Sequence, residues 1–357
     1  GAKVDHIKDD DTFGGVFGVT KGLAKKYSRK RVIDTPIAEH ITLSTAVGAA
    51  ATGLRPIAEL MFNDFIGFGL DPILNQGAKM RYMFGGKAKI PLVVRTVHGA
   101  GASAAAQHSQ SLYNMFAAIP GVKVVVPSNP YDAKGLLMSA IQEDNLVVFS
   151  EDKTLLGQKG NVPEEPYTIE IGKANVTREG DDLTIVAIGK MVAVAEETAE
   201  KLAEDQVSVE VIDLRSVSPW DQETVLDSVK KTGRLIVIDE SNPQCNIAGD
   251  VASVIGDVGF DYLDGPIKKV TAPDTPVPFA ANLEAAYMPN ADKVLNIASE
   301  LIDDLKKANA LLLEEAGVPS KNIYITEYST SENLDLFFSY RVEKGQTGRM
   351  LAFIGRK

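Results

Sequence analysis

The sequence contains one cysteine, Cys245, among 357 residues. A single thiol excludes an intrachain disulfide and a cysteine cluster for zinc, which suits a reducing compartment. No uninterrupted apolar run approaches the roughly 20 residues that span a bilayer. Residues 1–11 are polar and do not resemble a signal peptide. We therefore expect a soluble, cytoplasmic protein without a membrane segment.

Positive charge is also scarce, because 37 Lys and Arg residues stand against 48 Asp and Glu residues, giving a net charge of −11. Nucleic acids and acidic membranes would be repelled by such a chain at long range. We expect neither as a partner.

Two phosphate-binding motifs are missing as well. No Gly-x-Gly-x-x-Gly follows a predicted strand, and no Gly-x-x-x-x-Gly-Lys-Ser/Thr occurs. A nicotinamide dinucleotide or a nucleoside triphosphate is therefore disfavoured as the ligand.

The sequence does contain two successive α/β patterns, in which helix-like and strand-like segments alternate. Such alternation predicts parallel sheets covered by helices. Glycine, proline and mixed charge between the two patterns are typical of a linker. We predict a first domain over residues 1–152, a linker over 153–178, a second domain over 179–302 and an unassigned extension over 303–357 with a helix and a β-hairpin.

Glu39 is the first candidate site residue. Thr35 and Pro36 predict a helix cap and first turn, and the following helix, 38–51, is rich in alanine. A helix so lined can pack very close to a neighbour or a cofactor. Near the helix start, the dipole favours an ionised carboxylate. A residue that merely complements the dipole remains the simpler interpretation.

His108 is the second candidate. It follows the stretch 99–106, which consists of Gly, Ala and Ser and leaves room for a ligand. Neighbouring Gln107, Ser109 and Gln110 can fix the tautomer of its ring. A solvated loop histidine is the alternative.

Aromatic residues recur every three positions at Phe62, Phe65 and Phe68. This spacing most often marks a core stripe, and a cofactor platform is the minority interpretation. Tyr82, beside Lys79 and Arg81, lies at a cationic helix end, which complements the helix dipole in any protein.

Several ordered segments resemble the β subunit of the E1 component of thiamine-dependent 2-oxo acid dehydrogenase complexes. They include Arg31-Val-Ile-Asp-Thr-Pro-Ile-Ala-Glu39, Ala78-Lys-Met-Arg-Tyr-Met-Phe-Gly-Gly86, Ala106-Gln-His-Ser-Gln110, Asp213-Leu-Arg-Ser-Val-Ser-Pro219 and Thr271-Ala-Pro-Asp-Thr-Pro-Val-Pro-Phe279. The sequences of residues 58–65 and 124–134 are most similar to the acetoin dehydrogenase branch of this family. The resemblance covers about residues 11–301.

The resemblance implies a pyrimidine-binding domain followed by a transketolase C-terminal domain. It implies that Glu39 bonds the aminopyrimidine of thiamine diphosphate and activates it through the imino tautomer. Phe65 would pack against the pyrimidine, Tyr82 would join the cofactor-binding residues, and His108 would face the reaction centre during transfer to lipoamide.

Partners and ions follow from the same resemblance. Family members work as α2β2 heterotetramers, in which the α subunit binds Mg2+ and the diphosphate, and a lipoyl-bearing E2 acyltransferase receives the acyl fragment. The present chain lacks the diphosphate motif, as a β subunit should. A monovalent cation site, K+, would fall at the backbone carbonyls of Ala140, Glu143 and Asn145, at a helix end with free acceptors.

The chain also departs from the family pattern. The family's first helix and strand are not matched, so we expect one strand of the first sheet to be missing. Residues 40–44 after Glu39 are unusual, and residues 303–357 extend past the family's end. Three functions remain open. They are an acetoin-cleaving E1 β subunit, a pyruvate or branched-chain 2-oxo acid E1 β subunit, and a non-catalytic assembly subunit.

Overall fold

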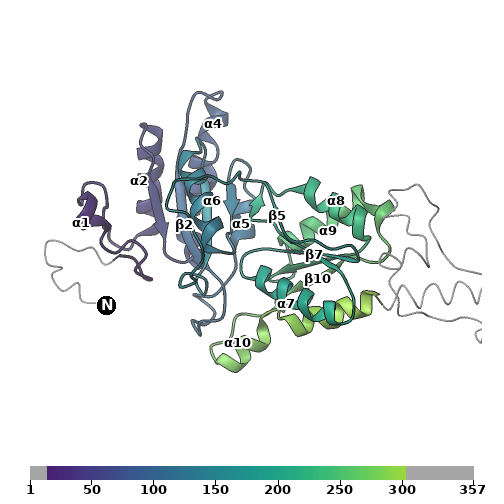
Figure 1. Cartoon of the computed structure of the whole chain (residues 1–357). Helices are drawn as coiled ribbons and strands as arrows, with labels where there is room; N and C mark the ends of the chain where they lie inside the picture. Colours follow the sequence, from purple (N-terminus) through teal and green to yellow (C-terminus); the bar gives the residue numbers. More distant parts are fainter. Residues whose placement is uncertain (1–13, 303–357) are drawn as a thin grey trace, which may run out of the picture.

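The computed structural model describes residues 14–302, and every structural statement below concerns this range. It folds into two α/β units, each built on a five-stranded sheet (Figure 1). The predicted extension over 303–357 lies outside the described residues. Residues 1–13 also lie outside the described residues. The expectation that one strand near the start of the chain is missing from the first sheet therefore stays a prediction.

The first sheet has the strand order β1-β2-β4-β3-β8. Its first four strands are parallel, as the alternating pattern predicts, whereas β8 pairs antiparallel with β3. Because β8 comes from the second half of the chain, it ties the two units together. The strands are β1 (Ile57–Leu60), β2 (Val93–His98), β3 (Lys123–Val125), β4 (Val147–Asp152) and β8 (Ser216–Ser218).

Helices cover both faces of this sheet. Leu43 of α2 and Phe116 of α5 pack in the same core as Val94 and Val148. Leu136 of α6 packs on the opposite face, as expected since neighbouring strand residues point to opposite sides. The helices and turns are α1 (Leu23–Tyr27), α2 (Glu39–Ala51), η1 (Asn63–Phe65), α3 (Ile66–Asp71), η2 (Pro72–Gly77), α4 (Met80–Met83), α5 (Tyr113–Ala117) and α6 (Pro130–Gln142).

The second sheet has the order β10-β9-β6-β7-β5. Its strands are β5 (Asn175–Arg178), β6 (Leu183–Ala187), β7 (Val209–Asp213), β9 (Leu235–Asp239) and β10 (Lys268–Thr271). β6 and β9 are buried throughout, as their apolar sequences predict. β5 lies in the predicted linker, yet it pairs antiparallel with β7. The predicted class, two α/β domains on largely parallel sheets, is confirmed, with one antiparallel edge strand in each sheet.

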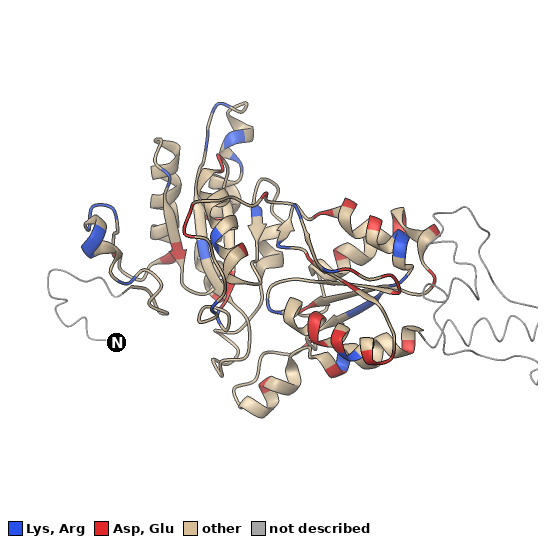
Figure 2. Cartoon of the chain, in the orientation of Figure 1, with Lys and Arg blue, Asp and Glu red and all other residues tan. Residues whose placement is uncertain are grey.

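Helices sandwich the second sheet as well (Figure 1). One face carries α7 and helical residues 291–302, and the other carries α8 and α9, whose core is continuous with that of the first unit. Acidic side chains are numerous on α7 and α8 (Figure 2). The helices and turns are α7 (Met191–Glu204), α8 (Gln222–Thr232), α9 (Ile247–Val258), η3 (Phe260–Tyr262) and α10 (Ala281–Tyr287).

Polar residues gather where the carboxyl ends of strands from both sheets meet. His98 and Asp152 end the paired strands β2 and β4, and Asp239 ends β9. The hydroxyl of Tyr113, on α5 of the first unit, donates to Asp239 of the second. Ligand sites of α/β sheets form at such strand ends.

Candidate active site

Glu39 is the first residue of α2 and is half-buried. The predicted cap at Thr35 and Pro36 is wrong, because the N-cap is Ala38 and the hydroxyl of Thr35 lies 3.2 Å from that of Thr42 instead. Helix α2 packs closely on α3 at Gly69. A Cβ at Gly69 would lie 2.3 Å from Leu43 Cδ1 and 3.9 Å from Glu39 Cβ. Glu39 therefore faces α3, which directly follows Phe65.

Phe65 and His108 belong to one aromatic cluster. The His108 ring packs edge-on against Phe62 at 4.9 Å and against Phe65 at 5.3 Å between centroids. Phe68 is 70% exposed, so the core stripe that the spacing favoured is wrong. The reason is local, since Phe62 and Phe65 flank a 3₁₀ turn with three residues per turn, whereas Phe68 lies on the α-helix that follows.

The cluster lies beside buried polar atoms that have no partner within residues 14–302. Both side-chain polar atoms of Asn63, which is fully buried, and Oδ2 of Asp64 are in this state. A half-exposed aromatic platform, a carboxylate at a helix start and free polar groups suit a flat heterocycle with ring nitrogens. The residues present therefore fit a pyrimidine ring.

His108 lies on the loop 99–112, which both units hold. Lys153 donates to the His108 carbonyl oxygen and to Ser109 Oγ, the latter at 3.2 Å, and Gln110 donates twice to Asp64. From the second unit, Glu240 accepts from the Ala100 N–H at 2.5 Å. The loop that carries His108 is thus fixed by charged residues that the sequence analysis gave no role.

A buried charged network lies under this loop. Lys190, which follows β6, lies 3.2 Å from Asp152 and 2.8 Å from Glu240, and it donates to the Ala100 carbonyl. One oxygen or nitrogen of each of His98, Asp152 and Glu240 lies within 4.8 Å of the others. The Lys190 ammonium already supplies a positive charge there, so this geometry does not call for a metal ion.

The network divides its charge unequally. Burial, with Asp152 adding to it, raises the pKa of Glu240 to about 8. Burial also pushes the pKa of Asp152 upward, but Lys190, His98 and Thr154 outweigh it and hold this pKa below its ordinary value. Asp152 is therefore the ionised partner of Lys190, and Glu240 is the carboxyl that takes up a proton.

His98 is kept neutral in this setting. Burial lowers the pKa of His98 to about 4 despite the pull of Asp152, and Nδ1 lies 2.8 Å from Ser150 Oγ. An unfolded histidine titrates near 6.5. Because the pKa of His98 is lower in the folded than in the unfolded protein, His98 contributes to the free energy of unfolding. This contribution is fully present above pH 6.5 and is lost as the pH falls toward 4.

We expect His98→Asn to flatten this pH dependence. The variant keeps a polar group near Ser150 but cannot titrate. Between pH 6.5 and 4, its free energy of unfolding should therefore fall by about 3 kcal/mol less than that of the wild type. Urea unfolding at a series of pH values measures the difference. Exposed His40→Asn is the control, and equal slopes in His98→Asn and wild type would contradict the prediction.

Tyr82 does not join the aromatic cluster. It lies on α4, is 88% exposed and makes no ring contact with Phe62, Phe65 or His108. A cofactor-binding role for Tyr82 stays a prediction.

The predicted K+ site lies at the end of α6. The Ala140 carbonyl accepts only a 3.3 Å bond from the Glu143 N–H. The Glu143 carbonyl, however, accepts from Arg55 at 2.9 Å, and Asn145 Oδ1 accepts from Arg81 at 3.1 Å. Since the Arg55 guanidinium already brings a positive charge to this helix end, the arrangement does not favour a second cation. The K+ site stays a prediction.

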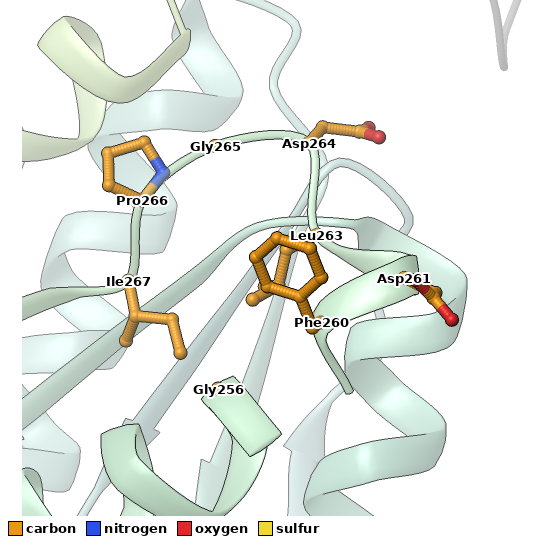
Figure 3. Close-up of a pocket in the computed structure, with 8 residues that line it drawn as sticks. All are labelled: Gly256, Phe260, Asp261, Leu263, Asp264, Gly265, Pro266 and Ile267. Atoms are coloured by element: carbon orange, nitrogen blue, oxygen red, sulfur yellow. The ribbon is translucent and has the colours of Figure 1, made fainter. Parts of the chain in front are cut away.

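A cleft of about 700 Å³ lies elsewhere, between the end of α9 and the start of β10 (Figure 3). Phe260, Pro266 and Ile267 line it together with Asp264. It lies at the amino end of β10, whereas ligand sites of α/β sheets lie at carboxyl ends. We therefore place the candidate site at Glu39, Phe65 and His108 instead.

Comparison with known proteins agrees with this geometry. The model of the transketolase pyrimidine binding domain matches residues 6–159, and that of the transketolase C-terminal domain matches residues 172–294. The acetoin:2,6-dichlorophenolindophenol oxidoreductase subunit beta of Bacillus subtilis is 57% identical over 304 residues, covering 85% of this chain and 89% of the relative. This chain belongs to the family of acetoin and 2-oxo acid dehydrogenase β subunits. The resemblance seen in the sequence is confirmed, and the family is thiamine diphosphate-dependent.

Further relatives lie on both branches of the acetoin and 2-oxo acid dehydrogenase β subunits. The acetoin:2,6-dichlorophenolindophenol oxidoreductase subunit beta of Cupriavidus necator is 51% identical, covering 82% of this chain and 86% of the relative. The pyruvate dehydrogenase E1 component subunit beta of Bacillus subtilis is 44% identical, with coverages of 81% and 89%. A solved structure called split gene transketolase, inactive beta4 tetramer, covers 79% of this chain and 87% of that one at 23% identity, with a TM-score of 0.66. That likeness shows the fold alone.

A third family model, multi-copper polyphenol oxidoreductase laccase, matches residues 276–357. Within the described part of this range, Val294, Ala298 and Leu301 pack on the second sheet, and Val277 and Tyr287 pack with Ala272, which directly follows β10, and with Ala100. Residues 276–302 therefore belong to the second α/β unit, and the remainder of the match is the extension that the sequence left unassigned. Within residues 14–302, no helix is long and apolar enough to cross a membrane.

Proposed function

We propose that this chain, paired with an α subunit, cleaves acetoin and passes the acyl fragment to the lipoyl group of an E2 acyltransferase. The carrying observation is that Glu39, at the start of α2, packs beside α3, and that α3 directly follows Phe65, which forms an aromatic cluster with Phe62 and His108. The substrate is argued from likeness, since the acetoin-oxidoreductase relative from Bacillus subtilis is 57% identical, whereas the pyruvate dehydrogenase relative from that organism is 44% identical.

Glu39 would hold the pyrimidine ring of thiamine diphosphate by sharing a proton with a ring nitrogen. When bound, the cofactor supplies a nucleophilic carbon and an electron sink for the substrate carbonyl. A helix dipole favours a carboxylate at this position, and α2 contains no other Asp, Glu, Lys or Arg (Figure 2). Phe65 would support the ring face. His108 would orient the lipoyl disulfide or protonate the sulfur that is freed when the acyl fragment bonds to the other sulfur and the S–S bond breaks.

The α subunit would complete the site. The present sequence contains no convincing diphosphate and Mg2+ motif, so we assign both to the partner. Large apolar side chains near the site are open to solvent, as a partner surface requires: Ile37 is 79%, Ile41 65% and Phe68 70% exposed. We propose that this surface contacts the α subunit in an α2β2 assembly.

Reconstitution tests the proposal. The chain is coexpressed with an α subunit, titrated with thiamine diphosphate and assayed by dye reduction with acetoin, pyruvate and branched-chain 2-oxo acids. Acetoin should give the highest kcat/KM. A higher value with pyruvate or a branched-chain acid would move the assignment to that branch. A pair that assembles but binds no cofactor would instead establish a non-catalytic assembly subunit.

His108→Ala should impair the transfer step selectively. We expect lipoyl acylation to slow about 100-fold, because one positioned acid or base contributes 10²–10⁴-fold, while thiamine diphosphate affinity stays within about threefold. His108→Gln, which keeps packing against Phe62 and Phe65 but cannot exchange a proton in the same way, should be equally slow. Loss of folding in both variants would favour a structural role.

A further inference from the structure

Glu284 links the second unit to the loop that carries His108. It lies on α10 and is 3% exposed, so its carboxylate is held away from solvent. Oε1 accepts from the Gly101 N–H and Oε2 from the Ser103 N–H, both at 2.8 Å. Both oxygens of this buried carboxylate therefore accept hydrogen bonds from backbone N–H groups of one loop.

The backbone of this loop is unusual. Four alternate residues have positive φ, namely Gly99 at 100°, Gly101 at 104°, Ser103 at 50° and Ala105 at 60°. Where residues with positive φ recur at such short intervals, successive N–H groups can converge on one side and form a concave anion-binding nest. A positive φ costs free energy at residues that have a Cβ, here Ser103 and Ala105, so contacts with the surrounding residues must stabilise it. The Glu284 carboxylate is the anion in this nest.

Other contacts from the second unit end at the same place. Tyr287 of α10 is buried against Ala100, and a Cβ at Gly101 would lie 3.5 Å from Met288 Sδ. Figure 1 shows α10 at the lower end of the boundary between the two units. His108 itself is only half-buried, and its position depends on how the preceding residues are fixed.

We propose that Glu284 is a positioning residue for His108. By fixing the nest at Gly101 and Ser103, it sets the course of the loop and thereby the place of the His108 ring over Phe62 and Phe65. The proposal rests on the role given to His108 above. It makes the second α/β unit a contributor to transfer chemistry without any residue of its own at the reacting atoms.

Glu284→Gln tests the proposal in the assembled α–β complex. The amide offers one acceptor and turns an NH2 group toward the second N–H, so the nest loses half its support. We expect lipoyl acylation to slow about tenfold, since small misplacements of a reacting group are costly. Dye reduction and thiamine diphosphate affinity should stay within about twofold. Deuterium uptake by the amides of residues 99–105 should rise about tenfold.

Two further variants serve as controls for Glu284→Gln. Glu284→Asp keeps the charge on a shorter stem and should recover part of the transfer rate. Glu300→Gln removes an exposed carboxylate in helical residues 291–302 and should change none of the measurements. If Glu284→Gln does not fold, Glu284→Asp carries the test. Equal losses of dye reduction and acylation would then overturn the proposal by showing a general structural role.

A double variant separates the proposal from the function it rests on. If Glu284 acts through His108, Glu284→Gln combined with His108→Ala should transfer no more slowly than His108→Ala alone, whereas multiplying losses would overturn the proposal. An unchanged rate in His108→Ala would overturn the role of His108 itself. A slow His108→Ala beside an unchanged Glu284→Gln would overturn only the role of Glu284.

Discussion

Glu39→Gln is expected to slow exchange of the cofactor's C2 proton about 1,000-fold in the assembled complex. Glutamine has the same shape as glutamate and can hydrogen-bond a ring nitrogen, but it cannot share a proton as a carboxylate does. Since Glu39 begins α2 and its Cβ faces α3, the substitution removes the proton-sharing group without opening a cavity. Quenched-flow NMR of bound cofactor measures the exchange.

Assembly provides the internal control for that experiment. Sedimentation of the complex and the thiamine diphosphate affinity should change little in Glu39→Gln, within about fivefold for the affinity, because one neutral hydrogen bond replaces a stronger one. Asp34→Asn, which removes an exposed carboxylate five residues earlier, should exchange at the wild-type rate. Equal exchange rates in Glu39→Gln and wild type would remove Glu39 from the mechanism.

Glu39 and His108 could be proposed from sequence because each lies in a segment that resembles the family, and a local pattern agrees with each assignment. Glu39 begins the alanine-rich helix α2, which packs closely on α3. His108 follows a Gly/Ala-rich loop that leaves room around its ring. Lys190, Asp152 and Glu240 could not be proposed, because they lie at the carboxyl ends of three different strands and meet only when the two sheets bring these ends together. Glu284 had no local signal at all, since its partners are backbone N–H groups far away in the chain.

The same distinction explains the fold. β6 and β9 are buried on both faces, so their apolar runs predict them. β8 has the sequence Ser-Val-Ser and β5 lies in a segment rich in turn residues, so neither has a strand-like pattern. Both are edge strands whose pairing is decided by tertiary contacts with β3 and β7. Short strands of this kind escape prediction because a distant partner, and not the local sequence, stabilises them.

Arg215→Met is expected to lower the free energy of unfolding by about 3–5 kcal/mol, the range for breaking a buried ion pair from one side. Arg215 lies between β7 and β8 and binds Asp132 on α6 with two nitrogens, Nε at 3.0 Å and Nη2 at 2.7 Å. Asp132 is fully buried, so the variant strands its carboxylate. Because α6 belongs to the first unit and β7 to the second, the pair also joins the two units.

Two comparisons isolate the cause of that loss. In urea unfolding, Arg215→Met combined with Asp132→Asn should lose less than the sum of the single variants, because the neutral amide no longer needs a cation, although the Asn129 amide that also donates to Asp132 keeps the helix start in place. Arg178→Met breaks a more exposed pair with Glu196 and should cost at most about 1 kcal/mol. If Arg215→Met costs no more than Arg178→Met, the interface tolerates an unpaired Asp132, and the two units are held together by their shared apolar core and by β8 instead.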